Sequence, residues 1–353
     1  MRQSMWLLVF AAASVPALLV GACSGDDTSV PTQDAGTDAS KDSTTDSPST
    51  GGDPVRGKYI VDTLASCGDC HTPRNADGSP DMTRYLAGND CFIGVNRGDA
   101  GPGGPQDPPG CLAARNLSNH ETGLKNRSDQ EIRDMFQNGK RPTGDALYPV
   151  MPYWVYHNMT DADAKAVVAY LRTVPGVDHR STSQAPWNSP PQGTAPPIDL
   201  SKVHTPKQEG NADYDSQMRG KYIAAVTAAC IECHTPDKAG VNPPTADRER
   251  WFAGNREFNR ADLHLPPNFP ETIHSANLTS DPTGLAGRSV DDIVKAIKQG
   301  VQPDGGLVCP PMPAGHLAPY SKITDEDARD IAKYLLSLPP IANARPDCQP
   351  TPP

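Results

Sequence analysis

A long segment of this chain occurs twice, and this internal repeat constrains the fold more than any other feature. The pentapeptide Arg-Gly-Lys-Tyr-Ile at 56–60 recurs letter for letter at 219–223, and a Cys-x-x-Cys-His-Thr-Pro segment begins eleven residues after each arginine. Matched Ala-Gly-Asn, Asn-Leu, Thr-Gly-Leu and Met-Pro segments follow, with an offset that varies only from 161 to 166 residues. We therefore predict two homologous domains in tandem, at 54–180 and 217–342.

The beginning of the chain has the pattern of an export signal. Arg2 precedes an apolar run over 5–20, which is shorter than the roughly 20 apolar residues of a transmembrane helix. We expect residues 1–22 to be a signal peptide. The Gly-Ala-Cys that ends it resembles the lipobox of bacterial lipoproteins, which implies lipidation of Cys23. Ser24 follows in place of Asp, which favours the outer membrane of the cell envelope, with the chain facing the periplasm.

The remaining segments lie outside the repeat. Residues 24–53 contain seven Asp and one Lys and almost nothing apolar, so we expect 23–53 to be a disordered acidic tether. This stretch carries −6 of the net charge of −10. The other residues are nearly neutral in total and have no basic stripe, which excludes nucleic acid as a partner. We expect the lipid on Cys23 to be the only contact of the chain with a membrane. A Pro-rich connector at 181–216 should be extended and stiff, and 343–353 is a C-terminal tail.

Helix-start signals recur at matched positions of both repeats. Ser128 and Ser289 each precede an acidic residue by three positions, which is a capping box, and a Gly ends each segment about ten residues later. Thr160 and Thr324 open a final helix whose apolar residues follow the helical period. Another short helix leads into each first Cys. No alternating strand pattern of any length occurs, so we predict an all-α fold.

Both repeats contain the sequence that attaches c-type haem. The two thiols of Cys-x-x-Cys lie on one turn, where each can form a thioether to a haem vinyl group, and the adjacent His ligates the iron from the proximal side. A redox-active Cys pair would need alternating strands and helices, and a zinc site would divide its ligands between two complete domains. We therefore predict two covalently bound haem c groups. The attachment residues are Cys67 and Cys70 with His71, and Cys230 and Cys233 with His234.

Taken together, these segments resemble class I-type cytochrome c domains, in which a helix, Cys-x-x-Cys-His, a loop-rich middle, a Met-Pro segment and a C-terminal helix follow one another. Their Cys-His-Thr-Pro, Thr-Gly-Leu and Met-Pro segments are similar to those of the haem-bearing subunits of bacterial membrane-associated dehydrogenases. Val150 replaces the first Pro of their Pro-Met-Pro, and Arg127 and Arg288 replace a Trp. The resemblance implies domains that each wrap one haem, and a dehydrogenase or another cytochrome as the redox partner.

Met151 and Met312 are the predicted sixth ligands of the two irons. Of the eight methionines only these two match between the repeats, each about 80 residues after its His and just before the final helix. His157 and His316 are rivals that do not align with each other, so we interpret them as exposed histidines. Iron held by His and Met is coordinatively full and suits outer-sphere electron transfer.

The favoured function is therefore single-electron transfer without bond-breaking chemistry. One alternative is a dihaem enzyme, peroxidase-like or thiosulfate-oxidising, with one catalytically open haem. Another is a haem-based gas sensor. Both need an open iron face, whereas both repeats offer a Met.

The four cysteines that remain after Cys23 and the haem thiols allow three disulfide pairings. Cys91 and Cys111 bracket a Gly- and Pro-rich insertion of the first domain, Cys309 lies beside the second Met-Pro segment, and Cys348 lies in the tail. Pairing within each domain, 91 with 111 and 309 with 348, is the economical prediction.

Several matched polar positions have two interpretations. Asn116 and Asn277 could hydrogen-bond haem propionates or cap loops, as could the two arginines after Thr-Gly-Leu. Tyr59 and Tyr222 are expected to pack where the first and last helices of each domain cross.

Overall fold

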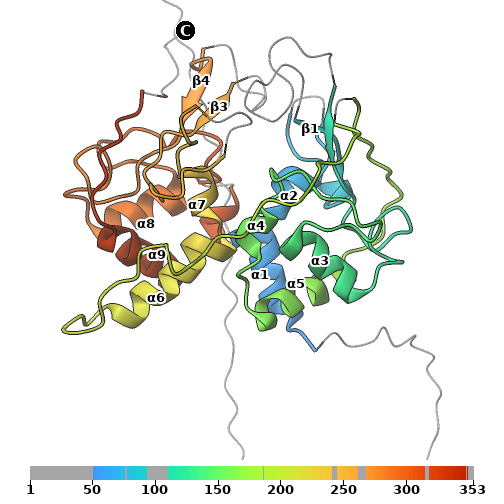
Figure 1. Cartoon of the computed structure of the whole chain (residues 1–353), viewed down its shortest axis with the longest axis horizontal. Coiled ribbons are helices and arrows are strands. Elements are labelled where there is room, and N and C mark those ends of the chain that lie inside the picture. Colours follow the sequence, from blue (N-terminus) through green and yellow to red (C-terminus); the bar gives the residue numbers. More distant parts are fainter. Residues whose placement is uncertain are drawn as a thin grey trace, which may run out of the picture. The chain divides into compact units, whose positions relative to one another are not determined.

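The two repeats build closely similar successions of helices (Figure 1). The structure is a computed structural model that describes residues 51–75, 78–93, 110–185, 187–240, 245–260, 268–314, 318–346 and 348. The predicted signal peptide, Cys23 and most of the tether lie outside these residues. Residues Ser47–Pro353 form one compact unit that contains both repeats.

The first repeat begins with a helix that changes pitch before the first haem-type cysteine. Its helical elements are α1 (Pro54–Tyr59), the π-helical turn η1 (Ile60–Leu64), α2 (Cys67–His71), the 3-10 turn η2 (Met82–Arg84), α3 (Asp129–Asn138), α4 (Tyr153–Tyr156) and α5 (Asp161–Thr173). The second repeat has α6 (Tyr214–Tyr222), the π-helical turn η3 (Ile223–Thr227), α7 (Cys230–Cys233), α8 (Val290–Gln299), the 3-10 turn η4 (Pro319–Lys322) and α9 (Asp325–Ser337). In the described part of the chain, no helix is long and apolar enough to span a bilayer.

The predicted helix starts are confirmed at the atomic level. Ser128 Oγ accepts a hydrogen bond from Glu131 N at 3.2 Å, and the Glu131 carboxylate accepts one from Ser128 N at 2.7 Å. Ser289 begins α8 with the same capping box. Gly139 and Gly300 end α3 and α8 in the left-handed conformation, which glycine adopts without steric cost.

Short strands are the departure from the all-α prediction. β1 (Asn89–Ile93) pairs with β2 (Leu112–Ala114), and β3 (Glu257–Asn259) pairs with β4 (Thr272–His274), both antiparallel. Segments of three to five residues are too short to show an alternating pattern, so these strands were not expected from the sequence. The helices nevertheless form most of the regular structure.

The first and last helices of each domain cross at a glycine. α1 lies beside α5, and α6 lies beside α9 (Figure 1). A Cβ atom on Gly57 would stand 1.9 Å from Ala166 O, and one on Gly220 would stand 1.9 Å from Asp330 O. Only glycine permits this close approach of the helices. The repeated pentapeptide is therefore explained in part by the crossing.

The connector follows the surfaces of both domains. Its Ile198 and Val203 side chains are buried, and Ile198 N donates to Trp154 O at 3.0 Å. The Lys221 ammonium group on α6 donates to Val203 O at 2.9 Å and to Thr205 Oγ1 at 2.7 Å. Helix α6 already begins at Tyr214, two residues before the predicted end of the connector.

Disulfides close one loop in each domain. Cys91 is bonded to Cys111, with Cα atoms 4.9 Å apart, and Cys309 is bonded to Cys348, with Cα atoms 6.1 Å apart. This is the within-domain pairing that the sequence favoured. The first bond links β1 to the segment just before β2.

Candidate haem-attachment sites

The two Cys-x-x-Cys segments form matched single helical turns, α2 and α7. The residue before each turn has a left-handed backbone, with φ of 47° at Ser66 and 48° at Ala229. A left-handed non-glycine residue is strained, and its occurrence at the same place in both domains marks a sharp change of direction. This turn separates the π-helical segment from the attachment helix. The four cysteines on α2 and α7 are free of disulfides.

The environment of these thiols differs from that of a redox-active pair. Burial raises the pKa of Cys67 and of Cys230 to about 12. Burial also raises the pKa of Cys70 and Cys233, with a further contribution from nearby carboxylates. Catalytic and redox-active cysteines have a lowered pKa, because the thiolate is the reactive form. The apolar surroundings instead suit attachment to an apolar plate such as haem.

Each histidine after the cysteine pair is held by a backbone carbonyl. His71 Nδ1 lies 2.7 Å from Arg115 O, and His234 Nδ1 lies 2.7 Å from Ala276 O. A carbonyl partner makes Nδ1 the protonated nitrogen and leaves the Nε2 lone pair available for a metal ion. Burial lowers the pKa of both histidines and so favours the neutral, ligating form. Both sites fit the proximal ligand of a haem iron.

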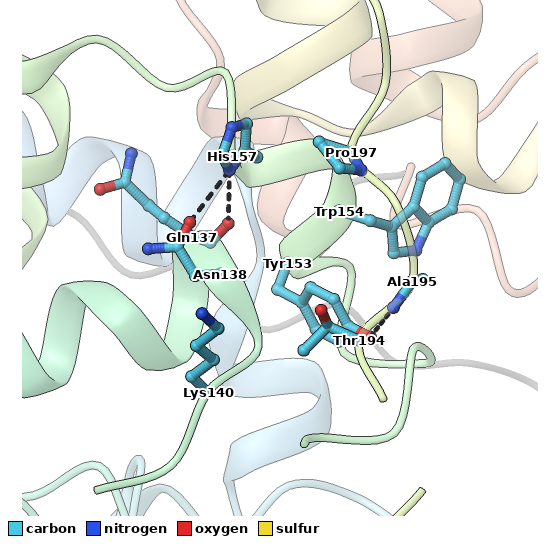
Figure 2. Close-up of a pocket in the computed structure, with 9 residues that line it drawn as sticks. All are labelled: Gln137, Asn138, Lys140, Tyr153, Trp154, His157, Thr194, Ala195 and Pro197. Carbon is cyan, nitrogen blue, oxygen red and sulfur yellow. Dashed lines mark hydrogen bonds between the residues drawn. The ribbon is translucent and has the colours of Figure 1, made fainter. Parts of the chain in front are cut away.

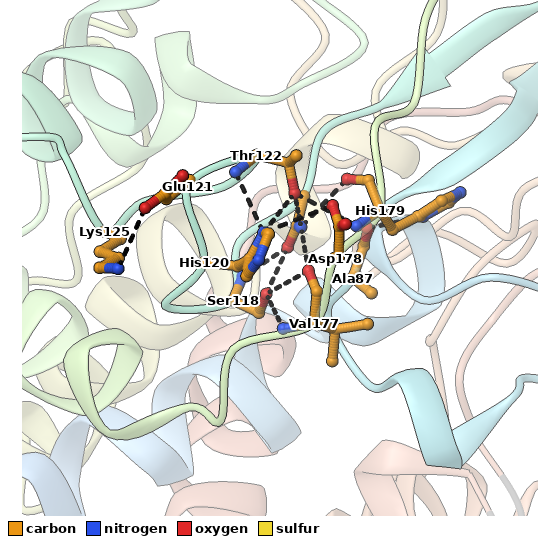
Figure 3. A network of polar contacts seen from close by, with 10 residues as sticks. Ala87, Ser118, His120, Glu121, Thr122, Lys125, Val177, Asp178 and His179 are labelled. Atoms are coloured by element: carbon orange, nitrogen blue, oxygen red, sulfur yellow. Dashed lines mark hydrogen bonds and ion pairs between the residues drawn. The ribbon is translucent and has the colours of Figure 1, made fainter.

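Asn116 and Asn277 support the two carbonyls from the adjacent position. Asn116 Nδ2 donates to Thr122 Oγ1 at 3.0 Å and to Val177 O at 2.8 Å, and its Oδ1 accepts from Ser118 N at 2.8 Å. Figure 3 shows Ser118, Thr122 and Val177 converging from the loop and from the segment after α5. Of the two interpretations left open by the sequence, loop capping is the one observed for Asn116.

The second domain repeats this network with equivalent residues. Asn277 Nδ2 donates to Thr283 Oγ1 at 2.9 Å and to Ile341 O at 2.8 Å, and Asn277 Oδ1 accepts from Thr279 N at 2.9 Å. Both asparagines therefore tie the loop whose carbonyl holds the histidine to the segment after the final helix.

Some buried polar atoms lack a partner among the described residues. They include the matched pair Asn89 Nδ2 and Asn255 Oδ1, and also Trp251 Nε1. An unpaired buried polar group is costly, so such atoms usually face a bound molecule or water. Their presence fits a cofactor with polar groups on its edge. In the sequence, only the repeated Ala-Gly-Asn segment pointed to the two asparagines.

The two matched methionines lie at equivalent turns before α4 and before η4. Met151 N donates to Tyr148 O at 3.1 Å, and Met312 N donates to Cys309 O at 3.2 Å. Both side chains pack, partly buried, against the apolar core. Their ligation to iron stays a prediction.

His157, the rival ligand in the first domain, is exposed. Its Nδ1 lies 3.0 Å from Asn138 Oδ1 and 3.2 Å from Gln137 O. His157 lines a pocket of about 190 Å³ together with Tyr153 and Ala195. Figure 2 shows these residues around the pocket. His316 lies outside the described residues.

A further matched pair was missed by the sequence comparison. Tyr156 Oη lies 3.5 Å from Ala65 O, and Tyr320 Oη lies 3.0 Å from Ala228 O, so each tyrosine contacts the carbonyl two residues before the first Cys. The two tyrosines are offset by 164 residues, whereas the nearby Met-Pro segments are offset by 161. Because the offset between the repeats changes over this short stretch, the sequence comparison did not align the two tyrosines.

Comparison with known proteins agrees with the duplicated architecture. Residues 54–175 and 217–339 each match the profile of the family described as cytochrome c. The chain is 30% identical to the fructose dehydrogenase cytochrome subunit of Gluconobacter japonicus over 189 residues, which are 52% of this chain and 34% of that protein. It is 27% identical over 302 residues to the cytochrome c subunit of the quinone alcohol dehydrogenase of Gluconobacter oxydans, covering 82% of this chain and 55% of that protein.

A diheme cytochrome c-type protein of Cereibacter sphaeroides is 31% identical over 125 residues, which are 35% of this chain and 36% of that protein. The chain thus spans between about a third and just over half of the length of these curated relatives. Two of the three are cytochrome subunits of bacterial dehydrogenases, as the resemblance in the sequence predicted.

Proposed function

The chain belongs to the cytochrome c family, and from that premise we propose that it is a dihaem electron carrier of the cell envelope. Each domain holds one covalent haem c, whose iron accepts and donates single electrons. The observation that carries the proposal is the matched pair of histidines, each with Nδ1 on a carbonyl and Nε2 left for a metal. A protein with one functional site would not need this arrangement twice.

The residues of each domain have distinct roles in this proposal. The two cysteines of α2 and of α7 fix the cofactor through thioether bonds, and His71 and His234 are the proximal ligands. Met151 and Met312 are the distal ligands, because they occupy equivalent turns against the core. A thioether ligand raises the reduction potential and closes the iron to small molecules. We therefore assign electron transfer rather than catalysis to both domains.

The physiological partner in this proposal is a redox protein, either a dehydrogenase or another cytochrome. Relatives named as cytochrome subunits of fructose and alcohol dehydrogenases support this class of partner. Electrons would pass from that donor through this chain to a respiratory acceptor. We further propose a lipid anchor at Cys23 and a position facing the periplasm, with the outer membrane favoured by Ser24.

Carbon monoxide titration of the reduced, purified protein tests the carrier function. The haem content is first counted by pyridine haemochrome absorbance, and two haems per chain are expected. Neither haem should bind carbon monoxide at neutral pH, because His and Met occupy both axial positions. One haem that binds readily would contradict one Met assignment and would favour the dihaem enzyme.

The anchor is tested separately by Cys23→Ser. The unchanged chain should fractionate with membranes and yield a lipid-modified N-terminal peptide in mass spectrometry. The variant should yield no lipid-modified peptide. An unmodified Cys23 in the unchanged chain, or a lipid-modified peptide from the variant, would contradict lipid anchoring at this residue.

A further inference from the structure

Two tyrosines of the repeated pentapeptide make reciprocal contacts between the domains. Tyr59 Oη donates to Asp327 Oδ2 at 2.7 Å and accepts from Thr324 N at 3.1 Å, both on the final helix of the other domain. Tyr222 Oη donates to Asp163 Oδ2 at 2.8 Å and accepts from Thr160 N at 3.1 Å. Each tyrosine therefore contacts the first turn of the opposite domain's last helix. The sequence had pointed to packing at the helix crossing of each domain, and these contacts with the other domain add to that expectation.

Each tyrosine hydroxyl group lies at the start of a helix, where it bonds to a backbone N–H group and to a carboxylate. Thr160 and Thr324 are the N-caps of α5 and α9, so their N–H groups lie at the start of a helix. The carboxylate of Asp163 is buried and also accepts from Arg56 Nε at 2.9 Å. A buried carboxylate requires such partners, and here one partner comes from each domain. The tyrosine hydroxyl groups thus stabilise the docked arrangement of the two domains.

The interface that these tyrosines flank lies next to both attachment segments. The π-helical turns η1 and η3, which lead into the first Cys of each domain, pack against each other. Helix α4, which follows Met151, packs on η3, and η4, which follows Met312, packs on η1. Each domain therefore touches the other through the segments that precede its cysteines and follow its methionine. A change in docking would move the two haem sites relative to one another.

An electrostatic contact supports the closeness of the two sites. Burial raises the pKa of Tyr156 well above its usual value, and the Glu232 carboxylate on α7 of the other domain adds to the rise. Tyr156, which contacts the segment before Cys67, therefore also lies close to the second attachment helix, α7. The docked interface lies between the two sites.

We propose that Tyr59 and Tyr222 are positioning residues that hold the two domains docked and thereby set the rate of electron exchange between them. This inference rests on the proposed dihaem function. In the exchange, one domain loses one electron and the other gains it, and no bond or proton is transferred. Each hydrogen bond to a carboxylate favours the docked state by roughly tenfold.

The test compares Tyr59→Phe, Tyr222→Phe and the double variant with the unchanged holoprotein. Electron exchange is measured in half-reduced protein by magnetisation-exchange NMR of the haem methyl signals, at several dilutions to isolate the intramolecular rate. Amide hydrogen exchange at Thr160 and Thr324 reports the docking directly. Tyr170→Phe is the matched control, because Tyr170 Oη donates to Asp62 Oδ2 at 3.3 Å, a tyrosine–carboxylate hydrogen bond within a single domain.

The double variant should lose amide protection at both threonines and slow the exchange at least about tenfold, with unchanged absorption spectra and midpoint potentials. The control should match the parent. Lost protection with an unchanged exchange rate, or unchanged protection, would overturn the proposal. Asp327→Asn, which keeps the side-chain shape, should slow the exchange in the same direction if the double variant does not fold. A protein that lacks haem would instead contradict the proposed function.

Discussion

At the scale of single residues, the candidate haem-attachment sites depend on polar side chains next to the carbonyls that hold the histidines. Asn116 and Asn277 follow the residues whose carbonyls hold His71 and His234, and both asparagines link those loops to the segment after the last helix. Partners around a ligating histidine set its orientation and basicity. If haem iron binds at His71 and His234 as proposed, the asparagines would act on it through these histidines.

Asn116→Ala should lower the free energy of unfolding and should leave His71 less firmly oriented in the first candidate haem site. The change leaves Ser118 N and Val177 O without their partner in a buried setting, at a cost of about 1–3 kcal/mol in the free energy of unfolding. The midpoint potential of one haem should shift while the other stays constant. Denaturant titration and spectroelectrochemistry measure the two effects. Asn75→Ala, at an exposed turn, is the control, and a potential that shifts equally in both variants would contradict the assignment.

The raised pKa values of Tyr59 and Tyr222 predict that the folded protein loses stability at alkaline pH. Burial, together with the neighbouring carboxylate, raises the pKa of each to about 12. Unfolded tyrosine loses its proton near pH 10, so between pH 10 and 12 the folded state binds more protons and stability falls as pH rises.

After allowance for solvent screening, we expect about 1 kcal/mol per pH unit from the pair. Urea unfolding at pH 9, 10 and 11 should show a shallower decline in the double Phe variant than in the parent. Equal slopes would show that these hydroxyl groups do not carry the effect.

At the scale of elements, the glycine in each repeated pentapeptide determines how closely the helices cross. The obstructing atoms opposite Gly57 and Gly220 are backbone carbonyls, which cannot move aside as a flexible side chain can. A methyl group at either position must therefore separate the helices.

Gly57→Ala should destabilise the first domain by about 1–3 kcal/mol, as overpacking does in well-packed interiors. Gly193→Ala is the control, because nothing lies within 4 Å of its Cβ position. That control should change the free energy of unfolding by less than about 0.5 kcal/mol. Thermal denaturation of both variants measures the difference, and equal midpoints would contradict the close crossing.

At the scale of the whole molecule, the connector and the domain interface turn two repeats into one unit. Lys58 and Lys221 occupy the same position of the pentapeptide, yet Lys58 is exposed while Lys221 is buried under the connector. Burial lowers the pKa of Lys221, and its ammonium group is satisfied by Leu200 O, Val203 O and Thr205 Oγ1. Identical residues thus have different roles because the connector covers only the second of the two lysines.

Lys221→Met should release the connector and lower the free energy of unfolding by about 1–3 kcal/mol, since two carbonyls and a hydroxyl lose their donor. Limited proteolysis should cut faster between 200 and 205. Lys58→Met, at the matched position, should change stability by no more than about 1 kcal/mol, because its ion pair with Asp62 is at the surface. Equal sensitivity to protease in the two variants would contradict the role of Lys221.

The sequence alone determined the local features of this protein. The repeat, the capping boxes at Ser128 and Ser289 and the two Cys-x-x-Cys-His segments depend on residues that are neighbours in the chain, and local spacing decides helix starts and haem attachment. For the disulfides, the sequence left three pairings open, and the within-domain pairing was predicted only as the most economical of them.

Only the tertiary structure decided which partners these residues meet. Asn116 contacts Val177, and Tyr59 contacts Asp327, across 61 and 268 residues of chain. The short strands likewise arise from backbone pairing and not from side-chain alternation. Spacing along the chain carries no information about such contacts, because the packing of helices and loops sets which distant groups come within hydrogen-bond distance.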